Sequence, residues 1–156
     1  MAQALIERSE LDQKLYADLE SLDSSRRFTT EQLEIIYALG YAHIAQAQYG
    51  QALPIFAFLA QYGPTKRHYI YGLALCLQME KRLEEAINIY SLCATLFPDC
   101  IEATQRIAQC QVSADDHVAA RMTLSRLLRY AQASGDNDLI KNTQAMLSRV
   151  ASSASA

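Results

Sequence analysis

Three histidines and four cysteines are the residues of this chain best suited to chemistry, and their spacing matches no catalytic or metal-binding pattern. His43, His68 and His117 lie far apart, and the chain has no HExxH motif, no CxxC pair and no glycine-rich phosphate loop. Because a metal site or an activated nucleophile needs several such groups at short, defined spacing, we expect no enzyme activity, no cofactor and no metal site. The cysteines are expected to be reduced and mostly buried; they are Cys76, Cys93, Cys100 and Cys110.

The composition is typical of a soluble, mainly helical domain. The 156 residues are 51% hydrophobic and 20% charged, with only 5 glycines and 3 prolines, the two residue types that disfavour helices most. A net charge of −3 argues against a whole-surface attraction to nucleic acid or anionic lipid. The chain has no run of about 18 apolar residues, and its N-terminus lacks the basic start and apolar block of a secretory signal. We therefore expect a cytoplasmic protein.

A period of 34 residues runs through the chain. The recurring positions are Ala52, Ala86 and Ala120; Phe56, Tyr90 and Leu124; Gly40, Ala74 and Ala108; and Pro64 and Pro98. This is the period of the tetratricopeptide repeat, in which two antiparallel helices form a hairpin. The small residues allow the helices to approach closely, and each proline ends the second helix of its hairpin.

We therefore predict an all-α fold of three tetratricopeptide hairpins in a short right-handed solenoid, with an N-terminal helix and a C-terminal capping helix. Residues 1–29 form the N-terminal helix and linker, residues 30–150 the repeat domain, and residues 151–156 a tail. The repeats lie at about 33–66, 67–100 and 101–134, and the capping helix at 137–150. The expected helices span about 4–21, 31–46, 51–62, 67–79, 84–96, 101–113, 117–132 and 137–150.

A second line of residues runs along the first helix of each repeat, beside the line that packs the hairpin. In the first repeat, Leu39 and Gly40 are expected to pack the hairpin, which leaves Tyr37 and Tyr41 on the inner surface. Apolar side chains beyond those that the hairpin needs indicate a groove for an extended apolar peptide, with glutamines bonding the peptide backbone. The alternative is that the tyrosines pack only against neighbouring helices and that His68 is solvated. The predicted groove consists of Tyr37, Tyr41, Ile44, His68, Tyr71, Leu75, Gln78, Met79, Gln105, Gln109 and Val112.

The N-terminal segment carries a stripe of leucines that is open to two interpretations. Leu11, Leu15 and Leu19 recur at four-residue spacing on one helical face. The stripe either forms a weak homodimer or packs on the first repeat of its own chain. Two basic pairs, Arg26-Arg27 and Lys66-Arg67, are interpreted as solvated segments, although Lys66-Arg67 could also contact a bound peptide.

Three stretches of the sequence resemble the class II (LcrH/SycD-like) tetratricopeptide chaperones of bacterial type III secretion systems. Residues 34–41 have the family's acidic residue, aliphatic-Tyr pair and Leu-small-aromatic triplet. Residues 72–78 read Gly-Leu-Ala-Leu-Cys-Leu-Gln, similar to the family's Gly-Leu-small-x-Cys-x-Gln run, and residues 108–110 are near its Ala-Glu-Cys. The resemblance covers about residues 30–150, although the third repeat lacks the family's usual proline and has Gln109 in place of the common Glu.

The resemblance implies a binding protein without chemistry. Members of this family hold hydrophobic, pore-forming translocators in the bacterial cytoplasm before secretion, and they grip a short extended segment near the client's N-terminus in the concave groove. They commonly form homodimers that involve the N-terminal helix, and some also assist a transcription activator. The resemblance thus predicts a cytoplasmic chaperone whose partners are translocators, without nucleic-acid binding or stable membrane association.

The main alternative is a general tetratricopeptide adaptor or regulatory cofactor. One known type of adaptor binds a C-terminal carboxylate with a clamp of Lys, Asn and Arg side chains. At the matching positions this chain has Tyr37, Tyr41, Gly72, Glu102 and Arg106, of which only Arg106 fits. The carboxylate clamp is therefore disfavoured, and another kind of adaptor stays open.

Overall fold

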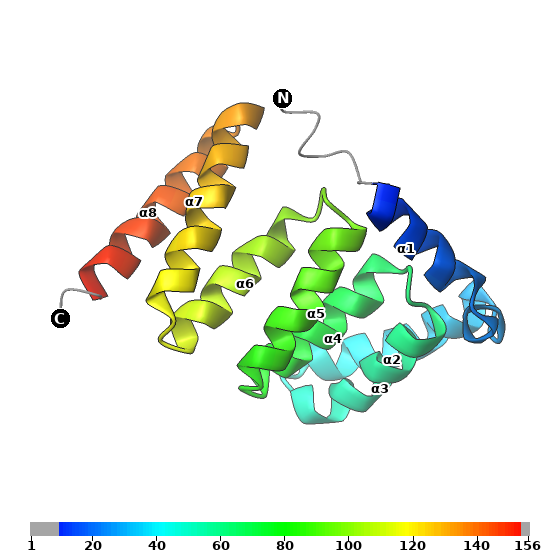
Figure 1. Ribbon diagram of the computed structural model, residues 1–156. Helices are drawn as coiled ribbons and strands as arrows, with labels where there is room; N and C mark the ends of the chain where they lie inside the picture. The colour runs from blue at the N-terminus through cyan, green and yellow to red at the C-terminus, as the bar shows by residue number, and fades with distance from the viewer. Residues whose placement is uncertain (1–9, 154–156) are drawn as a thin grey trace.

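The computed structural model describes residues 10–153, and every regular element among them is helical (Figure 1). The elements are α1 (Glu10–Ser21), the 3₁₀ helix η2 (Asp23–Arg26), α2 (Thr30–Ala45), α3 (Tyr49–Tyr62), α4 (Arg67–Met79), α5 (Leu83–Leu96), α6 (Ile101–Ser113), α7 (His117–Ser134) and α8 (Asn137–Ser153). The predicted all-α fold is confirmed, and α2 to α7 begin and end within two residues of the predicted bounds. The expected helical residues 4–9 lie outside the described part of the chain.

The ends of the helices follow from local chemistry. The Gln32 amide donates to the Thr29 side chain at 3.2 Å and the Thr29 amide donates to the Gln32 side chain at 2.9 Å, so a reciprocal capping box starts α2. Helices α3 and α5 end two residues before Pro64 and Pro98, because proline has no amide hydrogen with which to continue a helix. Gly135 ends α7 with a left-handed φ of 71°.

Successive helices pair into three hairpins, α2–α3, α4–α5 and α6–α7, and α8 packs along α7 at the end of the row (Figure 1). Each hairpin packs on the next through α3 with α4 and α5 with α6. One buried cluster gathers around Phe56 and Leu59 where the first hairpin meets the second, and another around Tyr90 and Leu96 where the second meets the third. No described helix is both long and apolar enough to cross a bilayer.

Nine of the eleven recurring positions of the 34-residue period are buried, and Pro64 and Pro98 are half-buried. The three periodic alanines and the three residues that follow them by four positions are each at most 1% exposed. The interpretation of Leu39 as a hairpin-packing residue is wrong, because its side chain is 56% exposed. The inward face of α2 instead carries Leu33, Ile36 and Gly40. Leu39 is one residue before Gly40 and therefore lies about 100° away from it around the helix.

The ring of Phe56 lies where three helices approach most closely. A Cβ atom added to Gly40 on α2 would lie 2.9 Å from Cε2 of this ring, and one added to Gly72 on α4 would overlap the opposite edge at Cε1. Phe56 itself is on α3 and is 1% exposed. Only residues without a side chain can pass so close to both edges, so the two glycines set the spacing of α2, α3 and α4.

Helix α1 packs against α5, in the second hairpin, and against η2. Tyr16 and Leu19 contact the buried cluster of the second hairpin, and the Tyr16 ring meets Phe97 edge-on at a centroid distance of 6.2 Å. Part of the predicted leucine stripe thus packs within its own chain, against the second repeat rather than the first. Leu15 is 37% exposed, and the Leu11 side chain lies outside the described part of the structure.

Gly72→Ala is expected to destabilise the fold, because the added methyl group would overlap the Phe56 ring. Overpacking of this kind lowers the free energy of unfolding by about 1–3 kcal/mol. Gly50→Ala is the matched control: Gly50 is also helical, but its added Cβ would meet only the Glu80 carboxylate, at 3.5 Å. In chemical denaturation the control should equal or slightly exceed the parent. A Gly72→Ala variant as stable as the parent would contradict the role given to the glycines.

Candidate peptide-binding groove

A cavity of about 800 Å³ lies between α2 and α4 and reaches the start of α6. Its walls combine aromatic and aliphatic side chains with a charged end. The lining residues are Tyr37, Tyr41 and Ile44 of α2, Phe56 of α3, Arg67, His68, Tyr71, Gly72 and Leu75 of α4, and Asp99, Cys100 and Glu102 at the start of α6. A cavity of this size can accommodate several side chains of an extended peptide.

Six of the eleven residues predicted for the groove line this cavity. They come from the first helices of the first two hairpins, α2 and α4, and therefore face one shared hollow. That geometry is what an extended peptide needs if its alternate side chains are to enter one continuous site. The six are Tyr37, Tyr41, Ile44, His68, Tyr71 and Leu75.

Two further predicted residues on α4 lie outside the cavity. Gln78 is half-buried, and its Oε1 accepts a hydrogen bond from the Tyr90 hydroxyl at 2.9 Å. This oxygen is therefore already engaged within the second hairpin. Met79, the last residue of α4, is 41% exposed beyond the cavity wall.

The third repeat continues the predicted line only in part. Gln105 lines a separate polar hollow of about 600 Å³ that α6 forms with α7 and α8, and this hollow shares Asp99 and Glu102 with the cavity. Gln109 and Val112 instead line a hollow of about 380 Å³ against α8. The two residues nearest the end of α6 thus face the capping helix and not the aromatic cavity.

Tyr37 is the centre of an aromatic cluster in the cavity wall. Its ring centroid lies 4.7 Å from His68 and 5.8 Å from Tyr69, and the centroids of Phe56 and Tyr41 are at 5.9 Å and 6.1 Å. Burial raises the pKa of the Tyr37 hydroxyl. Neighbouring helices therefore cover much of the surface of the Tyr37 ring. Tyr41, in contrast, is 58% exposed and keeps most of its surface free for a partner.

Tyr71 both supports the fold and lines the cavity. Its ring meets that of Tyr90 at a centroid distance of 5.5 Å, and its hydroxyl accepts a hydrogen bond from Arg106 Nε at 3.2 Å. The ring is thereby held in one orientation, with part of its surface in the cavity wall. A peptide that contacts Tyr71 would meet a side chain that needs little further ordering.

The Glu34 carboxylate ties α2 to α4 beside the cavity. It accepts a hydrogen bond from the Tyr69 hydroxyl at 2.6 Å and lies 2.7 Å from Nε2 of His68. The hydrogen bond from Tyr69 is the main cause that lowers the pKa of Glu34, and the His68 contact acts in the same direction. The carboxylate is therefore ionised near neutral pH, where it orients His68 edge-on against Tyr37.

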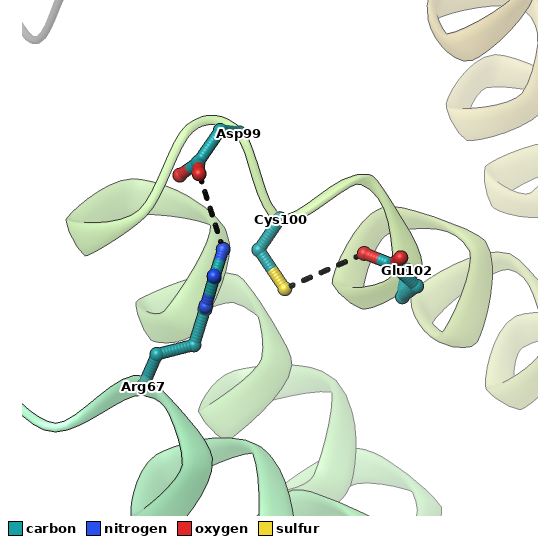
Figure 2. A network of polar contacts seen from close by, with 4 residues as sticks. All are labelled: Arg67, Asp99, Cys100 and Glu102. Atoms are coloured by element: carbon teal, nitrogen blue, oxygen red, sulfur yellow. Dashed lines mark hydrogen bonds and ion pairs between the residues drawn. The ribbon is translucent and has the colours of Figure 1, made fainter.

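The far end of the cavity is charged, and among its charged groups the sequence indicates only Arg67 as a possible peptide contact. Figure 2 shows the four side chains together: Arg67 Nη1 lies 3.2 Å from Asp99 Oδ2, and Cys100 Sγ lies 3.9 Å from Glu102 Oε2. Arg67 lines the cavity and its side chain is 47% exposed, so it remains partly solvated and is also placed where a bound peptide could contact it. Asp99 is 32 residues away in the sequence, and only the packing of successive hairpins brings the two together. No local motif could have revealed this pair.

The arrangement suits binding. Apolar rings and side chains form the middle of the cavity, and ionic groups stand at one end, so it offers apolar pockets for side chains and polar groups for a peptide backbone. Within residues 10–153, no three His, Cys, Asp or Glu side chains gather as a metal site requires.

Comparisons with known proteins bear on the fold. The family model described as tetratricopeptide repeat matches residues 68–99, which form most of the second hairpin. A search of curated proteins found no match. Among solved structures, PcrH from Pseudomonas aeruginosa is 25% identical, with 80% of this chain and 95% of that chain covered and a TM-score of 0.70.

Two further solved structures are similar to this chain. The Yersinia enterocolitica type III secretion chaperone SycD, solved with a peptide of the translocator YopD, is 19% identical, with 80% and 95% coverage of this chain and that chain and a TM-score of 0.70. A type III secretion complex from Aeromonas hydrophila is 20% identical, with 94% and 99% coverage and a TM-score of 0.76. The chain thus shares the tetratricopeptide fold of proteins from type III secretion systems.

Proposed function

We propose that the chain is a type III secretion chaperone that binds an extended N-terminal segment of a hydrophobic translocator in the cavity between α2 and α4. The binding keeps the translocator soluble and competent for secretion. The observation that carries the proposal is the cavity itself, because six residues predicted from the sequence as a peptide groove line one hollow. The fold supports it, since SycD, which has the same fold, was solved with a translocator peptide.

A cavity with apolar walls and a charged end suits a client that must be held and later released. The membrane-seeking segments of a translocator aggregate in water, and covering one short segment gives a modest, reversible interaction. Ordering a flexible chain on binding lowers the affinity further for a given contact area. We place this activity in the bacterial cytoplasm, where the client waits before it enters the secretion channel.

The cavity residues divide into two roles in this proposal. Tyr41 and Leu75, from facing helices, contact the apolar side chains of the client. Arg67 and Glu102, at the charged end, are available to its backbone or polar side chains. Glu34 touches no client and holds the two walls at a constant separation.

We also propose a weak homodimer that uses the part of α1 left open by its own chain. Leu15 is 37% exposed on a helix whose Tyr16 and Leu19 pack inward. Leu15→Glu should convert dimer to monomer in analytical ultracentrifugation with helix content retained, because an unpaired charge is costly in an apolar contact. Ala17→Glu, exposed on another face of α1, should leave the dimer intact. A Leu15→Glu chain with the mass of the parent would contradict the proposal.

The Tyr41→Ala, Tyr71→Ala double variant should retain far less client than the parent. Aromatic anchors carry about 2 kcal/mol or more each in such interfaces, so client recovered with the tagged chain from its native cell should fall by more than about tenfold. Tyr41→Ala alone should keep the thermal midpoint of the parent, because its ring is 58% exposed. Tyr71→Ala removes the contacts with Tyr90 and Arg106. The thermal midpoint of the double variant is therefore measured on the same samples, to separate lost binding from lost stability.

Leu39→Ala is the matched control for Tyr41→Ala. Leu39 is on the same helix and is 56% exposed, but it does not line the cavity. It should therefore retain client as the parent does. If the double variant still holds its client, or if Leu39→Ala loses it equally, then the client binds to another face of the repeats.

A further inference from the structure

Two cysteines stand on either side of the turn that joins α5 to α6. Cys93 is in the last turn of α5, Cys100 immediately precedes α6, and both belong to the same buried cluster. The turn between them is closed by hydrogen bonds, from the Phe97 amide to the Cys93 carbonyl at 2.8 Å and from the Cys100 amide to the Phe97 carbonyl at 2.9 Å. The chain therefore doubles back over a short segment with both cysteines in one buried cluster. The pKa of each thiol is shifted mainly by the other.

The two thiols differ in access. Cys100 is 5% exposed and lines the cavity, and Figure 2 shows its thiol directed toward Glu102, beside the ion pair of Arg67 and Asp99. Cys93 is 0% exposed and is not part of the cavity wall. A small solute that enters the cavity therefore meets the sulfur of Cys100 first.

They also differ in acidity. The neighbouring Cys93 thiol lowers the pKa of the Cys100 thiol, against the opposing effects of burial and of the Glu102 carboxylate. The Ala103 amide at the start of α6 also lowers it. The same interaction raises the pKa of Cys93. Cys100 is the thiol that a solute in the cavity can reach, and its lowered pKa favours the nucleophilic thiolate, so we assign it as the attacking sulfur of the pair.

The other two cysteines lack these properties. Cys76 and Cys110 are each 0% exposed and do not line the cavity. Burial raises the pKa of Cys76 to about 11 and also raises that of Cys110. Both are thus expected to be inert, as buried structural thiols are.

We propose that Cys93 and Cys100 form a redox-active dithiol, which peroxides oxidise to an intramolecular disulfide at the charged end of the cavity. Cys100 thiolate attacks one oxygen of the peroxide; the O–O bond breaks, the leaving oxygen takes up a proton, and Cys100 becomes a sulfenic acid. The Cys93 sulfur then attacks the Cys100 sulfur, the S–O bond breaks, and hydroxide leaves with the Cys93 proton as water. With hydrogen peroxide, two thiols lose two electrons and two protons, and the peroxide becomes two waters.

The disulfide changes the cavity wall without breaking a hairpin. The Cys100 sulfur must turn from Glu102 toward Cys93, because the two sulfurs of a disulfide are only about 2 Å apart. The start of α6 is then joined covalently to α5, next to the Arg67–Asp99 ion pair. The proposal concerns the chemistry of the thiols and does not depend on the proposed client.

Peptide mapping after peroxide treatment tests the proposal. Trypsin cleaves after Arg82 and Arg106 and at no residue between them, so both cysteines fall in one peptide, 83–106. After treatment of the folded chain with hydrogen peroxide, this peptide should lose the mass of two hydrogens and regain it with dithiothreitol. The neighbouring peptides, which carry Cys76 and Cys110, should keep free thiols. An 83–106 peptide of unchanged mass, or equal oxidation of all four cysteines, would overturn the proposal.

Two variants separate the roles of the pair. Cys93→Ser should stop at the sulfenic acid, which dimedone traps on Cys100, whereas Cys100→Ser should give neither product. A measurement on the unmodified chain guards against variants that fail to fold: iodoacetamide should alkylate Cys100 in the native protein at least about tenfold faster than Cys76 or Cys110. Equal rates at the three sites would show that Cys100 is not the activated thiol.

Discussion

The spacing of the first three repeat helices depends on one packing arrangement, the Phe56 ring held between two glycines. Gly40 on α2 and Gly72 on α4 approach opposite edges of the ring closely enough that neither could carry a side chain without displacement. Phe56 is also part of the cavity wall, so the ring that fixes the helix spacing also fixes the width of the groove. In the proposed function, packing and binding therefore share the same atoms, and a change that relaxes one alters the other.

The cavity wall combines rigid and accessible aromatic groups. Tyr37 is held by four neighbouring rings, and the Glu34 carboxylate joins α2 to α4 beside it. Tyr41, one turn further along α2, keeps more than half of its surface free. A preorganised wall with an exposed aromatic edge loses little conformational entropy when an extended chain docks, which favours binding by a site of modest area.

The 34-residue period predicts the hairpins and their ends, because alanine, proline and glycine act through local sterics that a sequence displays directly. The same reasoning finds six cavity residues on α2 and α4. It fails for Gln109 and Val112, because each repeat of a solenoid is rotated relative to the last and the corresponding face of α6 meets α8. It also misses the Arg67–Asp99 pair, which exists only through the stacking of hairpins far apart in sequence.

The most direct measurement is site-specific photocrosslinking in the native cell, with a photoreactive amino acid at position 41 or, as control, at position 39. The two positions are similarly exposed on α2, at 58% and 56%, but only position 41 lines the cavity. We predict that position 41 crosslinks to a segment near the N-terminus of a hydrophobic translocator, identified by mass spectrometry, and that position 39 does not. Equal crosslinking from both positions, or crosslinks from position 41 to unrelated proteins alone, would contradict the proposed groove.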